Sequence, residues 1–294
     1  MLDNSLRDTY DAAMDFEPFV HLVRLAIRED LDEAGDVTSN AVFGAESGAL
    51  TLVSKDQGVL AGSGMLDLVF REVDREVIVE WQRSDGDRLG SGDTIATVSG
   101  RTRSLLAGER TALNFLSLLS GIATATSRYV AAAAGRAIVL DTRKTIPGYR
   151  ELSKYAVRVG GGTNHRMGLY DMVMLKDNHI DLCGSITGAV ARVREQLGNR
   201  YRIEVECRTP ADVEEAIAAG VDVVMLDNMD PGTISAVVAA AGDRVTLEAS
   251  GNVNLDTIGA LSATGVDFIS VGKITHSVKA FDFSLKYSAG AHGE

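Results

Sequence analysis

From Ala137 onward the sequence repeats one pattern: a short apolar run, a polar tip and a helical stretch. Glycines stand where the helical stretches should stop, and prolines stand where two of them should start. The apolar runs are 137–140, 172–175, 202–205, 221–226, 245–247 and 268–271, and the clearest helical stretches are 185–197, 210–219, 231–241 and 255–264. Strands that alternate with helices form parallel sheets covered by helices. The pattern therefore predicts a parallel α/β architecture, either a barrel or an open doubly wound sheet.

The tips of the apolar runs favour the barrel, because nearly every run ends in side chains capable of chemistry. In a barrel, the carboxyl ends of all strands converge on one mouth, whereas an open sheet brings together only the strands at a switch point. No run is followed by a glycine-rich dinucleotide motif or a Walker A motif, so nothing indicates a nucleotide cofactor. We expect a barrel that six strands leave incomplete. The tips are Asp141–Lys144, Lys176–His179, Glu206, Asp227–Asn228, Glu248–Gly251 and Gly272–Lys273.

The first hundred residues follow a different pattern. A helix is predicted over 16–31, and short β-like runs follow at 50–53, 59–61, 77–81 and 94–98, separated by turn residues. A long helix over 103–119 then leads to the repeating part. We expect a smaller N-terminal α+β domain with an antiparallel sheet, over residues 1–115 and joined by 278–294, and an α/β barrel over 116–277.

Composition excludes several classes of protein. The chain has 294 residues, 45% of them hydrophobic, and a net charge of −12, which argues against nucleic-acid and anionic-membrane partners. Its two cysteines, Cys183 and Cys207, are too few for a disulfide framework or a four-ligand zinc site, and we expect buried thiols. Trp81 is expected in the core of the small domain. The polar stretch 1–8 is unlike a signal peptide, and we predict a cytoplasmic protein.

Positive charge is concentrated in one part of the chain. The segment from Arg136 to Lys176 carries a net charge of +5, which leaves −17 for the rest. A basic segment in an acidic protein suggests that an anionic small molecule is held there. Three of its cations, Arg150, Lys154 and Arg158, are spaced four apart and are predicted to form an exposed stripe on a helix.

The remaining cations follow the strand ends and would meet at the barrel mouth. Arginine binds carboxylates or phosphates through two parallel hydrogen bonds, and lysine acts as a point charge. Ion pairs with nearby aspartates are the structural alternative for each cation alone. Together, the cations favour a binding site, because cations gathered without a ligand would repel one another. They are Arg143, Lys144, His165, Arg166 and Lys176.

Two acids end consecutive strands. Glu206 and Asp227 could hold Mg²⁺, directly or through water, or bind sugar hydroxyls. They could also neutralise Lys176 and Arg143. Ser250, Gly251 and Gly272 end the last two runs, where barrels often bind a phosphate through loop N–H groups.

These residues leave two mechanisms open, besides a protein that binds anions without catalysis. One is transfer of a phosphorylated sugar with a pyrophosphate leaving group. The other is Schiff-base chemistry of the aldolase type at Lys176 or Lys144, since burial and cationic neighbours can lower the pKa of a barrel lysine. The spacing of the residues does not separate these two mechanisms.

Several blocks of sequence resemble the nicotinate-nucleotide pyrophosphorylase family, also called quinolinate phosphoribosyltransferases. The resemblance runs in order from about residue 29 to 286. Its blocks are Glu29–Asp30, Gly35–Ser39, Glu109–Phe115, Asp141–Gly148, Gly160–Arg166, Lys176–Ile180, Met225–Met229 and Thr275–Ser277.

The resemblance implies a homodimer of chains with an N-terminal α/β domain and an incomplete α/β barrel. It implies a reaction of NAD biosynthesis, in which quinolinate and phosphoribosyl pyrophosphate give nicotinate mononucleotide, pyrophosphate and CO₂. A molybdenum-linked subgroup shares the fold and much of the site, so it is the alternative within the family.

The resemblance also assigns roles, including catalytic ones for Lys144, Lys176, Glu206 and Asp227. The carboxylates of quinolinate would meet Arg143, His165, Arg166 and Lys176, together with Arg110 of a neighbouring subunit. Lys144 would contact phosphoribosyl pyrophosphate, and Glu206 and Asp227 would position the ribose and the hydration shell of Mg²⁺. The wider set of substrate-binding residues adds Thr142, Ser250, Gly251, Asn252, Ser270, Gly272 and His276.

The chain departs from the family pattern at two positions. Asn252 stands where many members have a second glycine, and Ile146 stands where threonine is frequent. Neither change removes a side chain that binds substrate. Asparagine adopts left-handed backbone conformations less freely than glycine, so the loop at Asn252 is the place where the backbone could differ.

Overall fold

The structure, a computed structural model, describes residues 14–287, and the chain divides into two compact units. One unit comprises the chain up to Ala125 and from Val278 onward, and the other is Thr126–Ser277. The division falls inside helix α4 (Thr102–Ala133), which continues past the expected end at residue 119. The polar stretch 1–8 and the final residues 288–294 lie outside the described part of the chain.

Helix α4 continues through Gly121, although glycine commonly ends a helix. A Cβ atom at this position would lie 2.5 Å from the carbonyl oxygen of Lys279. Glycine is therefore needed because the returning C-terminal segment approaches the helix backbone closely. The N–H of Phe281 also donates to the carbonyl of Ser117 on α4 (2.9 Å), so this segment is bound to the helix.

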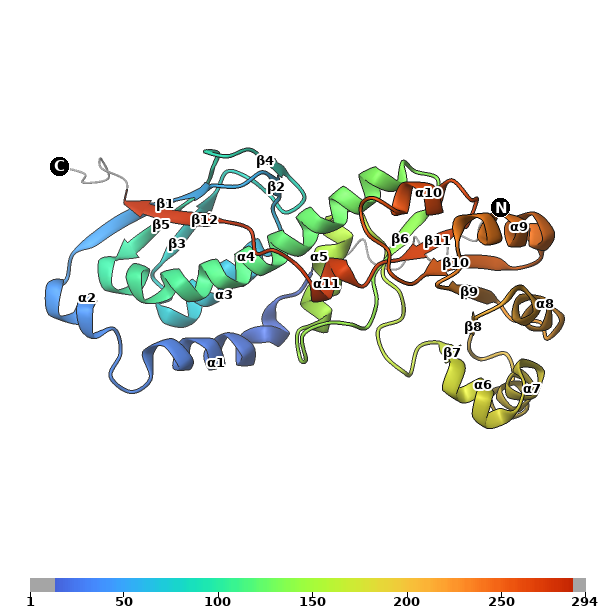
Figure 1. Cartoon of the computed structure of the whole chain (residues 1–294). Coiled ribbons are helices and arrows are strands. Elements are labelled where there is room, and N and C mark those ends of the chain that lie inside the picture. The colour runs from blue at the N-terminus through green and yellow to red at the C-terminus, as the bar shows by residue number, and fades with distance from the viewer. Residues whose placement is uncertain (1–13, 288–294) are drawn as a thin grey trace. The chain divides into compact units, whose positions relative to one another are not determined.

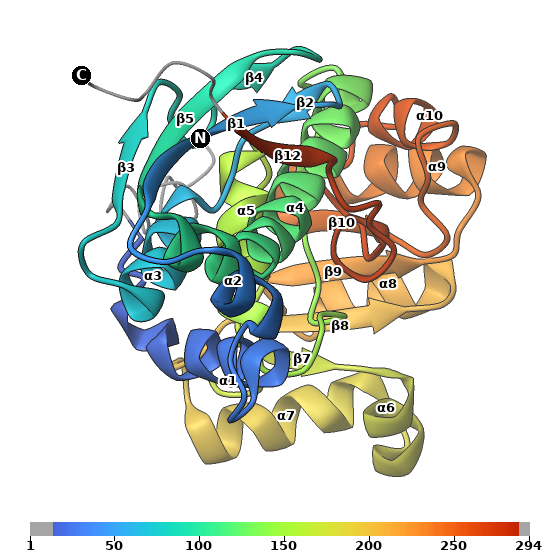
Figure 2. The same cartoon turned by 90° about the vertical axis from the view of Figure 1, so that its left-hand side faces the viewer.

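The N-terminal unit is built on an antiparallel sheet with the strand order β12-β1-β5-β3, as the β-like runs predict. Figures 1 and 2 show α3 and the first part of α4 along one side of this sheet. The strands are β1 (Ser47–Ser54), β3 (Ile78–Trp81), β5 (Thr94–Arg101) and β12 (Phe283–Tyr287), while β2 (Gly58–Val59) pairs with β4 (Arg88–Leu89). The helices are α1 (Val20–Leu31), α2 (Val37–Val42) and α3 (Ser63–Val73), with a 3-10 turn at Glu17–Phe19.

The prediction that Trp81 lies in the core of this unit is wrong. Its side chain is only half-buried at the end of β3, and the indole N–H donates to the carboxylate of Asp67 on α3 (2.9 Å). A tryptophan N–H needs a hydrogen-bond partner, which an apolar core does not provide. The core is formed instead by aliphatic side chains such as Leu52, Met65 and Ile95, none of which is exposed.

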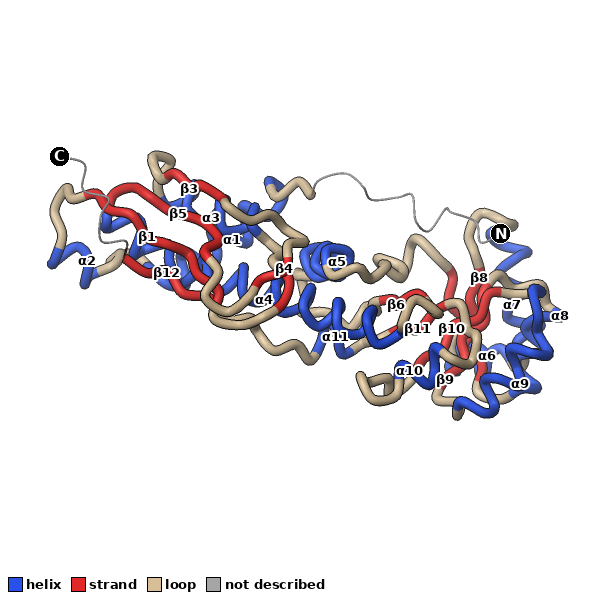
Figure 3. The backbone as a smooth tube through the Cα atoms, turned by 90° about the horizontal axis from the view of Figure 1, so that it is seen from above, coloured by secondary structure: helices blue, strands red, loops and turns tan. Residues whose placement is uncertain are grey.

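The C-terminal unit contains a six-stranded sheet, all parallel, with the order β6-β11-β10-β9-β8-β7. Figure 3 shows α7, α8 and α9 on the outer side of its strands. The strands are β6 (Ile138–Leu140), β7 (Val173–Leu175), β8 (Ile203–Cys207), β9 (Val223–Asp227), β10 (Thr246–Ser250) and β11 (Phe268–Ser270). The helices are α5 (Arg150–Val159), α6 (Asp177–Cys183), α7 (Ile186–Leu197), α8 (Pro210–Ala218), α9 (Pro231–Ala241), α10 (Ile258–Ser262) and α11 (Lys273–His276), with a 3-10 turn at Gly242–Arg244.

The barrel is incomplete, as predicted, because β6 and β7 are the two ends of the sheet. Thr163 forms an isolated parallel bridge with Leu140 of β6, and its N–H donates to the carbonyl of Val139 (2.9 Å). The segment that follows Gly160–Gly162 therefore lies beside β6, where a further strand would complete the barrel. This segment carries His165 and Arg166 into the site.

Side chains alternate between the two faces of a strand, so residues two apart share a face. Glu206 pairs in register with Met225, and Ser250 pairs with Asp227, which places these side chains on a common face. The positions two residues earlier on β8 and β10 are Glu204 and Glu248, both buried. Among the described helices, none combines the length and the apolar character needed to cross a membrane.

Candidate active site

The carboxyl ends of the strands of the C-terminal unit surround a cavity of about 620 Å³. This volume is typical of small-molecule sites. Arg110 belongs to the N-terminal unit, where its side chain is exposed on α4. The other predicted substrate residues all line the cavity: Thr142, Arg143, Lys144, His165, Arg166, Lys176, Glu206, Asp227, Ser250, Gly251, Asn252, Ser270, Gly272 and His276.

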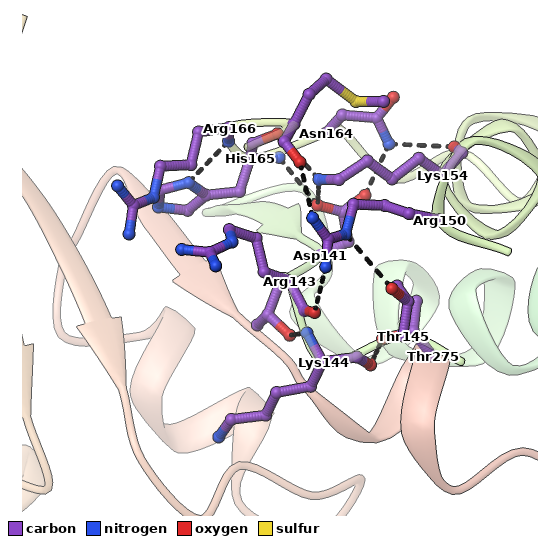
Figure 4. A network of polar contacts seen from close by, with 12 residues as sticks. Asp141, Arg143, Lys144, Thr145, Arg150, Lys154, Asn164, His165, Arg166 and Thr275 are labelled. Atoms are coloured by element: carbon purple, nitrogen blue, oxygen red, sulfur yellow. Dashed lines mark hydrogen bonds and ion pairs between the residues drawn. The ribbon is translucent and has the colours of Figure 1, made fainter. Parts of the chain in front are cut away.

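Two arginines enter the cavity from neighbouring segments. Arg143 follows β6, and Arg166 lies in the segment beside β6; Figure 4 shows both guanidinium groups extending to the same side. Burial and the charge of Arg143 lower the pKa of Arg166. Two like charges held this close repel each other, so the pair favours a bound anion.

The tip of β6 is fixed by hydrogen bonds to its backbone. Arg150 donates to the carbonyl of Arg143 (3.3 Å) and to the hydroxyl of Thr145 (3.2 Å), and Thr275 donates to the carbonyl of Lys144 (2.8 Å). At Arg143 and Lys144 these contacts occupy only the carbonyl oxygens, and the two side chains extend away from them (Figure 4). The mouth therefore presents cations from a fixed backbone.

The prediction of an exposed stripe at Arg150, Lys154 and Arg158 is wrong. Lys154 is fully buried and forms an ion pair with the fully buried Asp141, and its ammonium group also donates to the carbonyl of His165 (2.8 Å). Arg150 and Arg158 are half-buried. The four-residue spacing does mark one face of the helix, but this face packs against the barrel. A lysine can be buried there because Asp141 at the end of β6 supplies the opposite charge.

Asp141 also holds the segment that carries His165 and Arg166. It accepts the backbone N–H of His165 (2.9 Å) and the side-chain amide of Asn164 (2.6 Å), as Figure 4 shows. Burial raises the pKa of Asp141, and the nearby charge of Lys154 acts in the opposite direction. The ion pair thus joins the tip of β6, helix α5 and the Asn164–Arg166 segment.

Glu206 and Asp227 lie on neighbouring strands at the opposite side of the site from the β6 tip. Lys176 donates to a carboxylate oxygen of Glu206 (2.8 Å), and Asn228 donates to Asp227 (3.0 Å). Both acids line the cavity, so their carboxylate oxygens are available to a ligand there. Carboxylate oxygens suit Mg²⁺, which binds through one or two such groups and keeps several waters, so this pair fits a magnesium site.

The loop after β10 turns through two consecutive residues with positive φ. Gly251 has φ +99°, and a Cβ there would lie 2.2 Å from the side-chain oxygen of Asn228. Asn252 adopts φ +50°, and its amide donates to that same oxygen (3.0 Å). Asparagine is one of the few residues that tolerate this conformation. Asn252 therefore keeps the left-handed turn that a glycine would allow.

A buried cluster lies deeper on the same strand faces. His165 Nε2 is 3.2 Å from Glu204 and 3.4 Å from Glu248, and one nitrogen and two carboxylate oxygens lie within 4.8 Å of one another. This spacing suits a shared proton and would also admit a cation. Among the described atoms, the second carboxylate oxygen of each glutamate is buried without a hydrogen-bond partner.

The proton positions of this cluster follow from its contacts. Burial lowers the pKa of His165, but the hydrogen bonds to Glu204 and Glu248 outweigh burial and raise it to about 10. A raised pKa favours the imidazolium, which would carry a proton on both ring nitrogens. The backbone N–H of Arg166 points at Nδ1 (2.7 Å) and leaves no place for a proton there, so the geometry assigns a neutral ring with its proton on Nε2. The proton that the carboxylates would draw to the ring then stays on the glutamate pair, because burial and the charge of Glu248 raise the pKa of Glu204.

Five residues line the cavity that were not among the predicted site residues: Met174, Met225, Asn228, Val253 and Lys273. The methionines precede Lys176 and Asp227 by two positions, so strand alternation could have found them. Lys273 and Asn228 stand in predicted tips without a predicted role. Val253 carries no comparable signal. The methionines add apolar surface to a mouth that is otherwise polar.

Comparison with known proteins agrees with this fold and site. Two family models match: the quinolinate phosphoribosyl transferase N-terminal domain over residues 36–120 and the C-terminal domain over 122–286. A probable nicotinate-nucleotide pyrophosphorylase (carboxylating) of Bacillus subtilis is 45% identical over 252 residues, 85% of this chain and 87% of that one. The chloroplastic nicotinate-nucleotide pyrophosphorylase of Arabidopsis thaliana is 44% identical, over 90% of this chain and 81% of its own.

A solved structure has the same fold. The crystal structure of NadC from Streptococcus pyogenes superposes with a TM-score of 0.91 at 43% sequence identity, and the match covers 95% of this chain and 100% of that one. Both domains, their order and their fold are therefore those of one family. The chain belongs to the quinolinate phosphoribosyltransferase family.

Proposed function

We propose that this chain transfers a phosphoribosyl group from phosphoribosyl pyrophosphate to quinolinate, giving nicotinate mononucleotide, pyrophosphate and CO₂ as a step of NAD biosynthesis. The observation that carries the proposal is that Arg143, Arg166 and Lys176 line the same cavity as Glu206 and Asp227. A dianionic aromatic acid needs the cations, and a sugar phosphate with a metal needs the acids.

The cations would bind the carboxylates of quinolinate. Arg143 and Arg166 approach from one side of the cavity, and a planar guanidinium binds a carboxylate through two hydrogen bonds. Lys176 would supply the compensating charge beside them. Met174 and Met225 line the same cavity and would contact the apolar faces of the pyridine ring.

Phosphoribosyl pyrophosphate would occupy the side of the cavity formed by β8 to β11. The loop amides after Ser250 and Gly272 would bind its 5′-phosphate, and Lys144 would contact the pyrophosphate. Glu206 and Asp227 would hold Mg²⁺ through its water shell, and when bound the ion would neutralise charge on the pyrophosphate oxygens.

The reaction requires two bond exchanges. The bond between the anomeric carbon and pyrophosphate breaks with its electron pair on the leaving oxygen, and the lone pair of the pyridine nitrogen forms the new bond to carbon. Glu206 and Asp227 would stabilise the positive charge that develops at the anomeric carbon. The bond from C2 to its carboxylate then breaks, CO₂ leaves, and a proton takes up the electron pair left on the carbon next to the cationic nitrogen.

We further propose a homodimer in which Arg110 of the partner subunit contacts quinolinate. Arg110 is exposed on α4 while its neighbours Thr111 and Ala112 are buried, so its side chain is available to a second chain. We also propose a cytoplasmic site of action, and the two free thiols, Cys183 and Cys207, suit a reducing compartment. Plant relatives are named chloroplastic or mitochondrial.

A substrate comparison tests the reaction. Purified protein is incubated with phosphoribosyl pyrophosphate, Mg²⁺ and either quinolinate or nicotinate, which lacks the 2-carboxylate, and nucleotide formation is followed by chromatography. We expect nucleotide from quinolinate and at least a hundredfold less from nicotinate. Lys144→Met should lose activity, whereas Lys286→Met, at an exposed position on β12, should keep it.

The alternatives make different predictions in the same experiment. Nucleotide from another aromatic acid and none from quinolinate would assign the chain to the same-fold, molybdenum-linked type of relative. Covalent trapping of a carbonyl compound on Lys144 or Lys176 by borohydride would favour a Schiff-base lyase. For Lys176, the contact of its amino nitrogen with Glu206 (2.8 Å) argues against that lyase, because the nitrogen is held by the carboxylate instead of facing a carbonyl carbon.

A further inference from the structure

Two buried glutamates lie beneath the cavity and have no part in the proposed reaction. The side chains of Glu204 and Glu248 are 1% and 2% exposed, and His165, between them, is 8% exposed. Glu248 does not line the cavity, and neither does Glu204. Burying a carboxylate is unfavourable unless it is fully hydrogen-bonded, and each of these keeps one oxygen unpaired among the described atoms.

The two glutamates hold the imidazole ring of His165 from strands distant from its own segment. They come from β8 and β10, whereas His165 comes from the segment that lies beside β6. The imidazole therefore crosses the interior of the incomplete barrel. Its segment lies beside β6, but its ring contacts residues of β8 and β10. Its Nε2–H points to the glutamates at 3.2 and 3.4 Å, which fixes the orientation of the ring.

The opposite side of the same ring holds Arg166. The backbone N–H of Arg166 donates to Nδ1 of His165 over 2.7 Å (Figure 4), and its guanidinium donates to the carbonyl of Met172 (3.2 Å). Both nitrogens of the imidazole are thus engaged within the protein. His165 has no free ring nitrogen to offer to a substrate carboxylate, although its ring lines the cavity.

We propose that Glu204 and Glu248 are positioning residues for quinolinate binding, which act by orienting His165 so that its Nδ1 holds the backbone of Arg166 at the mouth. The inference rests on the proposed function, and it assigns His165 an indirect role in binding quinolinate. In many functional sites, a carboxylate that does not touch the ligand fixes the orientation and tautomer of a histidine through a hydrogen bond.

The test uses Glu204→Gln and Glu248→Gln, which keep the shape of the side chain and replace one carboxyl oxygen by an amide NH₂ group that cannot accept the Nε2–H of His165. Glu195→Gln is the matched control, because Glu195 is exposed on α7. Each variant is assayed for KM of quinolinate, KM of phosphoribosyl pyrophosphate and kcat, and its melting temperature is measured. We expect the KM of quinolinate to rise at least tenfold in both buried variants, with the other KM within twofold and no fall in melting temperature.

A second measurement does not depend on turnover. Nitrogen-15 NMR of the histidine rings reports the tautomer, and His165→Asn identifies the signal of His165. We expect the tautomer with the proton on Nε2 in the wild type, and a changed ring signal together with a shifted Arg166 amide in both glutamine variants. Glu195→Gln should change neither signal.

The outcomes separate this inference from the proposed function. If quinolinate is not a substrate of the wild type, the proposed function fails, and the NMR comparison alone decides the positioning role. An unchanged His165 ring and Arg166 amide in both glutamine variants would overturn it. So would a lowered melting temperature with an unchanged KM of quinolinate, because that result assigns the glutamates a purely structural role.

Discussion

The buried ion pair between Lys154 and Asp141 gives a prediction that is independent of activity. Lys154→Met keeps most of the volume of the side chain and removes its charge, which leaves a carboxylate buried without its cation. Both side chains are 0% exposed. Removing one partner of such a pair costs about 3–5 kcal/mol of the free energy of unfolding. Asp141 keeps the donors of His165 and Asn164, so we expect a loss near the lower end, about 3 kcal/mol.

A double-mutant cycle isolates the ion pair. Asp141→Asn alone leaves the ammonium group of Lys154 buried without its anion, so it should also cost about 3 kcal/mol. The double variant removes both charges and leaves the asparagine amide facing one of the two donors, which costs about 1–3 kcal/mol. We therefore expect the double variant to lose about 1–3 kcal/mol, well below the sum of the single losses of about 6 kcal/mol.

Urea unfolding followed by far-UV circular dichroism measures each free energy. Lys279→Met is the matched control, because Lys279 forms a surface ion pair with a side chain that is 84% exposed. That variant should change stability by less than about 1 kcal/mol. If the loss of the double variant equals the sum of the two single losses within about 0.5 kcal/mol, the two side chains are not coupled, and this result would refute the reasoning.

Three further predictions concern the site and the thiols. Arg143→Ala should raise the KM of quinolinate by roughly tenfold to hundredfold, because a hydrogen bond to a charged group contributes about 1.5–3 kcal/mol. The melting temperature should not fall, because the residue lies on a loop, and a large fall would assign Arg143 a structural role. Burial raises the pKa of the Cys207 thiol to about 12, so a thiol reagent should label Cys183 in the native protein and reach Cys207 only after unfolding; rapid labelling of both would contradict the burial. Mixing inactive Arg110→Ala chains with inactive Lys176→Ala chains should restore part of the activity, and mixed dimers that remain inactive would exclude a shared site.

Much of the fold follows from patterns in the sequence. The alternation of apolar runs with helices predicted the parallel sheet, and the polar residues at the ends of the runs predicted the lining of the cavity. This works because the carboxyl ends of parallel barrel strands point to one side. The prediction of the cavity lining therefore held even for residues far apart in the chain, such as Arg143, Lys176 and Asp227.

The sequence did not predict the buried charges. Lys154 has the spacing of an exposed helical stripe, and only the position of Asp141 at the end of β6 shows that this face is buried. Glu204 stands inside an apolar run, where a single acid gives no indication of its partner. In both cases the partner comes from a distant segment, which a local pattern does not contain.

In the proposed function, quinolinate, phosphoribosyl pyrophosphate and Mg²⁺ bind together in one cavity. The most direct measurement is release of CO₂ from quinolinate labelled in its 2-carboxylate, with each component omitted in turn and with EDTA added. We expect release only when all three components are present, and its loss with EDTA. Release without phosphoribosyl pyrophosphate, or no release from correctly folded protein with all three present, would contradict the account.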